Sequence, residues 1–253
     1  MAIERWKKAL EGEKKFWREH SYAFPTFQEE KDLLKKYNIE TDNKRLLEIG
    51  GGATSIVDLL TGERYSLDPL MDFFLENYNL PKDVNHIRGM GEELPFADNF
   101  FDIIFCLNAL DHAENPTKVL QEAYRCIAPN GIFFMTLNCY SPQIAKLRRF
   151  SENIGAGDIC HPYCFTIDEI KNELAQQGFE LLEQTEDPFF EEKFQTYLKN
   201  EEPKVSFMKR LLSVAKLRGW GYLFRRALIL PLHFIATRIY KSYPRVYFIC
   251  RKI

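Results

Sequence analysis

Three consecutive glycines, with a carboxylate placed further along the chain, form the most chemically informative pattern in this 253-residue sequence. The loop Gly50, Gly51 and Gly52 follows a short apolar run, which predicts a buried strand that ends in a tight turn. Asp68 follows a second predicted strand over 63–67. Glycines let the backbone pass close to a ligand, and an acid at this place can accept hydrogen bonds from both hydroxyls of a ribose. The pattern therefore predicts a site for an adenosine-containing cofactor.

The residues around the loop indicate which cofactor to expect. Gly50 and Gly52 fit a dinucleotide-binding fingerprint, but Ser55 stands where its third glycine or small substitute belongs. Glu48 lies two residues before the loop, where a pyrophosphate would gain nothing from a negative charge. The pattern Glu-x-Gly-x-Gly instead resembles the first motif of class I S-adenosylmethionine-dependent methyltransferases. In that family the loop faces the cationic ammonium of the methionine moiety, so the resemblance implies a favourable position for Glu48.

The resemblance continues through residues 87–108, which follow the family's third strand, adenine-contacting loop and fourth strand in sequence and in order. It implies S-adenosylmethionine as the cofactor and S-adenosylhomocysteine as the product. Beyond the glycine loop, it implies that the cofactor contacts Glu48, Asp68, Pro69, Met90, Gly91, Glu92 and Asn108. Met90 stands where the family commonly has an aspartate for the adenine amino group. A methionine can pack on the adenine face but cannot accept that hydrogen bond.

The family also implies the fold class. We expect an α/β architecture: a seven-stranded, mostly parallel, doubly wound sheet with an antiparallel last strand, N-terminal helices and a helical insertion before that strand. Apolar runs predict strands over the ranges 46–49, 63–67, 84–88, 101–107, 132–137, 179–184 and 245–250. The domain division is 1–40 for an N-terminal helical segment or lid, 41–186 for the cofactor-binding core, 187–244 for a basic, largely helical insertion and 245–253 for the final strand.

Local signals place several helices. Apolar residues at helical spacing predict a helix over 2–19, and a charged helix is expected to end at Tyr37. A helix is expected over 55–60 as well. Asn115 followed by Pro116 predicts a helix start, and a capping box predicts another helix from Thr166. The segment 140–158 is expected to be mobile.

Two histidines and a tyrosine are the candidates for acid–base chemistry. A hydroxyl acceptor needs a base to remove its proton, and histidine has a suitable pKa near neutral pH. His112 follows the fourth predicted strand, although a histidine at a helix start often has only a structural role. His161 and Tyr163 lie in a segment that often covers the acceptor in similar methyltransferases. Cys160 and Cys164 flank His161, but a structural zinc needs four ligands and no second Cys/His pair has a usual spacing, so no metal is expected.

The net charge of −2 conceals a division of charge along the chain. Residues 204–253 contain twelve Lys or Arg and no Asp or Glu, so the rest carries the other 22 basic and all 36 acidic residues. The basic tail suggests an anionic partner, such as a membrane surface or a phosphorylated substrate, with nucleic acid not expected. Alternatively, the tail docks on the protein's own acidic part. The uncharged stretch 227–237 is too short to cross a bilayer and contains Pro231, so a surface helix, packing on the sheet and a homodimer interface all remain open.

These observations lead to one functional hypothesis and two alternatives. The amino-terminal residues lack the apolar core of a signal peptide, and six cysteines fit reduced thiols, so we expect a cytoplasmic protein. The hypothesis is methyl transfer from S-adenosylmethionine to a small-molecule, sugar or lipid-linked acceptor that could be anionic. Oxygen is the expected acceptor atom because of the histidine candidates. The alternatives are a non-catalytic, cofactor-binding partner protein and an NAD-dependent oxidoreductase.

Overall fold

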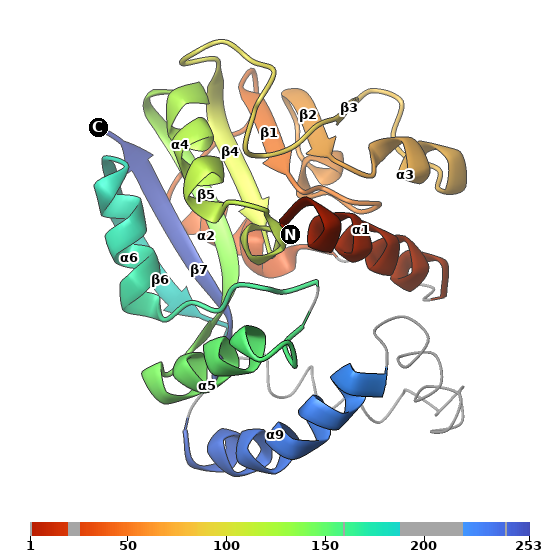
Figure 1. The fold of residues 1–253 in the computed structure, drawn as a ribbon. Coiled ribbons are helices and arrows are strands. Elements are labelled where there is room, and N and C mark those ends of the chain that lie inside the picture. Colours follow the sequence, from red (N-terminus) through yellow and green to blue (C-terminus); the bar gives the residue numbers. More distant parts are fainter. Residues whose placement is uncertain (1, 20–25, 159, 188–219, 241) are drawn as a thin grey trace.

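The structure, a computed structural model, describes residues 2–19, 26–158, 160–187, 220–240 and 242–253 (Figure 1). The strands are β1 (Arg45–Ile49), β2 (Glu63–Asp68), β3 (Asn85–Arg88), β4 (Phe101–Leu107), β5 (Ile127–Tyr140), β6 (Phe179–Glu186) and β7 (Ser242–Lys252). The α-helices are α1 (Ala2–Glu19), α2 (Gln28–Lys36), α3 (Met71–Asn77), α4 (Pro116–Cys126), α5 (Pro142–Asn153), α6 (Ile167–Gln176) and α9 (Trp220–Ile239). Two short 3-10 helices, η1 (Ile56–Leu59) and η2 (Leu110–His112), complete the described elements.

The strands form one seven-stranded sheet in the order β3-β2-β1-β4-β5-β7-β6. All pairs from β3 to β5 are parallel, whereas β7 is antiparallel to both β5 and β6. The strand order reverses beside β1, because the chain moves outward through β2 and β3 and then returns to β4. Ligands of open α/β sheets bind at such a switch point, beyond the carboxyl ends of the strands. The predicted fold class is confirmed.

Helices cover both faces of the sheet, which accounts for the apolar character of the central strands on both sides. On one face, Leu47 and Ile104 pack with Val119 of α4 and Leu174 of α6. On the other face, strand residues pack against Leu34 of α2 and against η1, and all of these residues are buried. Parallel strands between two helical layers need such two-sided apolar character.

The predicted helix starts before α4 and α6 are confirmed in atomic detail. The Asn115 side chain accepts a hydrogen bond from the backbone N–H of Lys118 at 3.1 Å, with Pro116 at the first helical position. Thr166 and Glu169 form the reciprocal capping box. Both caps satisfy backbone groups that the first helical turn leaves without partners.

Two segments differ from the expectation. The helix predicted over 55–60 is only the single 3-10 turn η1, because the buried Glu48 carboxylate accepts the Ile56 N–H and holds the start of the turn against β1. The segment 140–158, expected to be mobile, contains the three-turn helix α5. Ser141 caps this helix and Pro142 occupies its first position, so the sequence did carry a helix signal there.

The insertion before the last strand contains α9, which lies beside α5 on the outside of the molecule (Figure 1). β7 begins at Ser242, three residues before the predicted start at 245. The predicted insertion also includes 188–219, which lie outside the described residues, so the domain division stays a prediction. Among the described residues, no helix is long and apolar enough to cross a membrane.

Candidate active site

The glycine loop follows β1 and is shaped by its neighbours. Gly50 and Gly52 have φ angles of 76° and 59°, in the left-handed region that side chains other than glycine rarely adopt. A Cβ at Gly50 would overlap the side chain of Ala109, and one at Gly51 would overlap the hydroxyl of Ser66. The loop therefore needs glycine at these positions, and it leaves a bare backbone at the switch point of the sheet.

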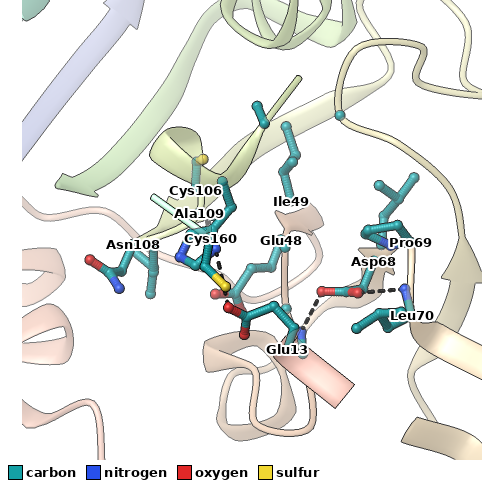
Figure 2. A pocket seen from close by; sticks show the side chains of 18 of the residues that line it. Glu13, Glu48, Ile49, Asp68, Pro69, Leu70, Cys106, Asn108, Ala109 and Cys160 are labelled. Carbon is teal, nitrogen blue, oxygen red and sulfur yellow. Dashed lines mark hydrogen bonds and ion pairs between the residues drawn. The ribbon is translucent and has the colours of Figure 1, made fainter. Parts of the chain in front are cut away.

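Asp68 ends β2 beside this loop and is almost fully buried, with 9% of its surface exposed. Its Oδ2 accepts the Gly52 N–H at 3.1 Å and its Oδ1 accepts the Leu70 N–H at 2.7 Å (Figure 2). Burial raises the pKa of Asp68 to about 6, although both hydrogen bonds act in the opposite direction. Because a carboxylate oxygen has more than one acceptor site, each oxygen keeps capacity for a ligand hydroxyl.

Glu48 lies beneath the loop and lines the same cavity. Its Oε2 accepts a hydrogen bond from the Ser55 hydroxyl and one of 2.7 Å from the Ile56 N–H. Burial raises the pKa of Glu48 to about 8. The Glu48 carboxyl therefore holds the η1 turn in place. A cation bound nearby would favour the ionised form of this carboxyl.

The loop after β3 supplies the next predicted cofactor residues. Met90, Gly91 and Glu92 all line the cavity. A Cβ on Gly91 would lie 2.8 Å from the side chain of Ile49, so any larger residue there would displace that side chain. The Glu92 carboxylate accepts the backbone N–H groups of Glu114 and Asn115 at 2.7 and 3.0 Å. The Glu92 side chain therefore holds the segment that leads into α4.

Pro69 and Asn108 also line the cavity. Asn108 follows β4 with a φ of 53°, and its backbone N–H is bonded to Thr136 at 2.9 Å. This left-handed turn directs the chain away from β4 at the carboxyl edge of the sheet. All of the predicted cofactor residues thus come together along one cavity.

The cavity has a volume of about 980 Å³ and is covered on one side by α1. Trp6, Glu13 and Trp17 of this helix contribute to its lining. Glu13 lies close to Asp68 and Glu48 (Figure 2). The Trp17 ring would lie 3.3 Å from a Cβ on Gly52, so α1 rests directly over the glycine loop. Ligand cavities commonly measure about 300–1,000 Å³, so this space can hold a nucleoside together with an amino-acid moiety.

His161 reaches this cavity from the segment before α6. Its Nδ1 lies 3.0 Å from Oδ2 of Asp111, a carboxylate with only 5% of its surface exposed. Burial alone would lower the pKa of His161, but the hydrogen bond and the charge of Asp111 outweigh it, so the pKa is raised. The other oxygen of Asp111 is buried without a hydrogen-bond partner. Asp111 therefore fixes the ring of His161 and leaves its Nε2 free to exchange a proton.

His112 lines the cavity next to His161, with the two ring centroids 4.1 Å apart. Its Nδ1 lies 3.6 Å from the Glu13 carboxylate of α1. Burial lowers the pKa of His112, so its neutral form dominates at neutral pH. The two histidines have opposite pKa shifts, because His161 is hydrogen-bonded to a carboxylate at short range.

Tyr163 does not line the cavity and therefore differs from the two histidines. Its hydroxyl donates a 2.6 Å hydrogen bond to the backbone carbonyl of Glu114, and its ring stacks on Phe165. The side chain is thus placed to hold the segment around His161 against the turn before α4. The structure gives it a supporting position, although it was predicted as a catalytic candidate.

Asp111, His112 and His161 are the described residues that could share a metal ion, since one ligand atom of each lies within 4.8 Å of the others. The same cluster can also be interpreted as an acid–base pair, because a short hydrogen bond joins His161 to Asp111. Cys160 and Cys164 face different carbonyls, Ala9 at 4.0 Å and Ala145 at 3.5 Å. The two thiols therefore do not converge on one point with His161.

Comparison with known proteins places the chain in a family. A family model described as "Methyltransferase domain" matches residues 18–184, about two thirds of the sequence. The chain belongs to the methyltransferase domain family. The predicted class I methyltransferase domain is confirmed at the level of this family. The match favours methyl transfer over the oxidoreductase alternative.

Individual relatives of this methyltransferase are distant. A sterol 24-C-methyltransferase of Kluyveromyces lactis is 22% identical over 187 residues, which cover 68% of this chain and 50% of the relative. The chain thus spans about half the length of the curated relatives it matches.

Two solved structures show the same fold. The YcgJ protein from Bacillus subtilis has a TM-score of 0.58 and 18% identity, covering 87% of this chain and 97% of its own. Phosphoethanolamine N-methyltransferase 2 of Haemonchus contortus, in complex with S-adenosyl-L-methionine, has a TM-score of 0.60 and 17% identity, covering 91% of this chain and 54% of its own. At this identity the likeness concerns the fold alone.

Three residues of the site were missed by reasoning from the methyltransferase sequence. Asp111 stands out in the sequence only as the neighbour of His112, yet it pairs with His161 fifty residues away. Glu13 and Trp17 belong to α1, which was assigned a covering role without particular residues. The spacing of Trp17 on an amphipathic helix is visible in the sequence, but no local pattern identifies its neighbours, the glycine loop and Phe74 of α3.

Proposed function

We propose that this methyltransferase acts on a hydroxyl oxygen of a small-molecule, sugar or lipid-linked acceptor, with His161 as the general base. The observation that carries this proposal is the 3.0 Å contact between His161 and the buried Asp111 at the edge of the cavity. A hydroxyl must lose its proton as it becomes a nucleophile, and an oriented histidine near neutral pKa can accept it.

The residues of the cavity fit S-adenosylmethionine. When bound, the cofactor supplies a methyl group activated by a cationic sulfur. Asp68 has acceptor capacity for the ribose hydroxyls, the glycine loop leaves room for the amino-acid portion, and Met90 can pack on the adenine. α1 covers the loop and excludes water, which favours orientation of the acceptor.

Within this arrangement each group near the acceptor has one role. Asp111 holds Nδ1 of His161, so that Nε2 takes the acceptor's proton. His112, whose pKa burial lowers, can orient the acceptor through a hydrogen bond from its neutral ring. Tyr163 keeps the segment of His161 in place through the Glu114 carbonyl.

The charge of the cavity narrows the acceptor class. Seven carboxylates lie among its described lining residues: Glu13, Glu29, Glu30, Glu48, Asp68, Glu92 and Asp158. Arg245 is the single Lys or Arg among the same described residues, and it lies 4.0 Å from Glu30. Burial raises the pKa of Glu48 to about 8, so this carboxyl is largely uncharged at neutral pH until a cation lies beside it. The other carboxylates still outnumber Arg245, which suits a cationic cofactor and favours a neutral or cationic acceptor over the anionic one considered from the sequence.

The experiment compares turnover with cofactor binding. Acceptors bearing hydroxyl or amine groups are screened for release of S-adenosylhomocysteine, and the active one is used with variants. His161→Ala should lower kcat by about 10²–10⁴-fold, the usual contribution of a general base, while the Kd of the cofactor changes little. His86→Ala, at a histidine of β3 that lies outside the lining, is the matched control.

A pH profile separates the base from a purely structural residue. Turnover should rise with pH as His161 loses its proton. Asp111→Asn removes the carboxylate that raises the pKa of His161, so this limb of the profile should move to lower pH. The proposal would be contradicted if His161→Ala kept full turnover. It would also be contradicted if this variant methylated a carbon or an amine at the wild-type rate.

A further inference from the structure

α9 presents a continuous apolar face to the outside of the molecule. Trp220, Phe224, Leu228, Leu232 and Ile235 are 65%, 68%, 63%, 53% and 53% exposed. With 3.6 residues per turn, these positions fall within roughly 120° of the helix circumference. Figure 1 shows α9, in blue, as the outermost helix beside α5.

The opposite side of the helix is the one that packs. Tyr222 and Ile229 are only 7% and 5% exposed, and Ile229 lines a small cavity of about 180 Å³ together with residues of α5. The orientation of α9 is therefore set by burial of its other side. The outward face of α9 does not contribute to the protein's own core.

This concentration of exposed apolar surface is unusual within the described part of the chain. Six of its eleven exposed large apolar side chains lie on α9 and Tyr240 directly follows it, whereas Leu59, Leu75, Phe150 and Ile253 are spread over the rest of the described chain. Isolated exposed apolar residues are ordinary, but a contiguous patch marks an interaction site.

The charge around the patch indicates what covers it. Arg225 borders the apolar face and is exposed, whereas Arg226 lies on the packed side, where its guanidinium donates to the Tyr222 hydroxyl at 2.7 Å. Residues 204–253 contain no Asp or Glu beside their twelve Lys or Arg. An apolar helix face on a basic segment that is free of acids complements a surface that combines hydrocarbon with negative charge.

We propose that α9 docks the protein on an anionic lipid surface, with the face from Trp220 to Ile235 at the boundary between headgroups and acyl chains. Arg225, which borders this face, would contact the lipid phosphates. Because α9 contains Pro231 and no described helix is long and apolar enough to cross a membrane, α9 lies along the surface. No described residue of α9 lines the large cavity, so this docking is independent of the proposed methyl transfer.

The test uses the full-length chain and vesicles of defined composition. Vesicles of phosphatidylcholine with roughly one third phosphatidylserine, and vesicles of phosphatidylcholine alone, are sedimented with the protein. The wild type should bind the anionic vesicles, and added salt should weaken binding. The double variant Phe224→Glu with Leu228→Glu should lower the partition coefficient by about tenfold or more, because apolar area is lost and negative charge is added.

A matched control replaces exposed leucines elsewhere. Leu59→Glu with Leu75→Glu introduces the same charges on η1 and α3 and should leave vesicle binding unchanged. All four positions are exposed, so thermal melting should show that each variant stays folded. Three outcomes would overturn the proposal: no binding to either vesicle, equal loss of binding in both double variants, or a concentration-dependent dimer in sedimentation velocity that only the α9 variant abolishes.

Discussion

Two buried carboxylates flank the glycine loop, and different partners hold each of them. Asp68 receives one backbone N–H on each oxygen, which leaves it suited to bind hydroxyl groups. Glu48 receives both of its hydrogen bonds on a single oxygen, from Ser55 and Ile56, and is the more deeply buried of the two. Burial raises both pKa values, so the protonation of the site depends on pH near neutrality.

Glu48→Gln should make the stability less dependent on pH. Because the folded-state pKa of Glu48 is about 8 and lies above its unfolded value, its stabilising contribution is complete at acidic pH and is lost as pH rises through about 8. The free energy of unfolding should fall by at most about 1.4 kcal/mol per pH unit from this group. Glutamine can still accept from Ser55 and Ile56 but does not ionise.

Thermal melting between pH 5 and 9 measures this effect. The Tm of the wild type should decline more steeply with rising pH than that of Glu48→Gln. Glu180→Gln, at an exposed carboxylate of β6, controls for the loss of one negative charge. Parallel curves for the wild type and Glu48→Gln would show that this carboxyl does not titrate in the expected range.

At the scale of elements, α1 converts an open sheet edge into a covered cavity. Trp17 packs edge-on against Phe74 and Tyr78, with ring centroids 5.4 and 6.0 Å apart. The Tyr78 hydroxyl donates to the backbone carbonyl of Trp17 at 2.6 Å. These contacts anchor the carboxyl end of α1 over Gly52, while Glu13 earlier in the helix faces the histidine pair.

Trp17→Ala should loosen this cover. We expect weaker binding of S-adenosylmethionine, expressed mainly as faster dissociation, since the ring no longer closes the loop. Stopped-flow dissociation and limited proteolysis near α1, with and without cofactor, would measure the change. Trp220→Ala removes an exposed tryptophan from α9 and should leave both readouts as in the wild type. Equal dissociation rates in both variants would exclude a covering role for Trp17.

The elements also show where sequence reasoning succeeds and where it fails. The sequence predicts β4 with its observed bounds and β1 to within one residue, because a short apolar run bounded by turn residues is typical of a buried strand. α5 was missed although Ser141 and Pro142 indicate its start, since the following residues are mostly polar and hide the helical period. η1 was taken for a longer helix because its tertiary partner, Glu48, is not a local signal.

For the whole molecule, topology decides which residues meet. The glycine loop and Asp68 come together because β1 and β2 are adjacent and parallel, as the family pattern implied. The pairing of Asp111 with His161 depends instead on how the segment before α6 crosses back to β4, which no spacing rule predicts. The grouping of the glycine loop with Asp68 could therefore be predicted from the sequence, whereas the pairing of Asp111 with His161 required the structure.

Charge is also organised over the whole molecule. The described lining of the large cavity is rich in carboxylates, whereas the basic residues of 204–253 belong to the tail that contains α9. This separation lets one region favour a cationic cofactor while another favours an anionic surface. The two properties can be measured independently, by cofactor titration and by vesicle sedimentation.

Calorimetric titration with S-adenosylmethionine tests the central claim that the cofactor lies between the glycine loop and Asp68. The wild type should bind one equivalent, and Asp68→Ala should weaken binding by about a hundredfold or more, since two hydrogen bonds to a charged group are each worth about 1.5–3 kcal/mol. Asp72→Ala, at a nearby exposed carboxylate in α3, should bind as the wild type does. Unchanged affinity in a folded Asp68→Ala would contradict the account.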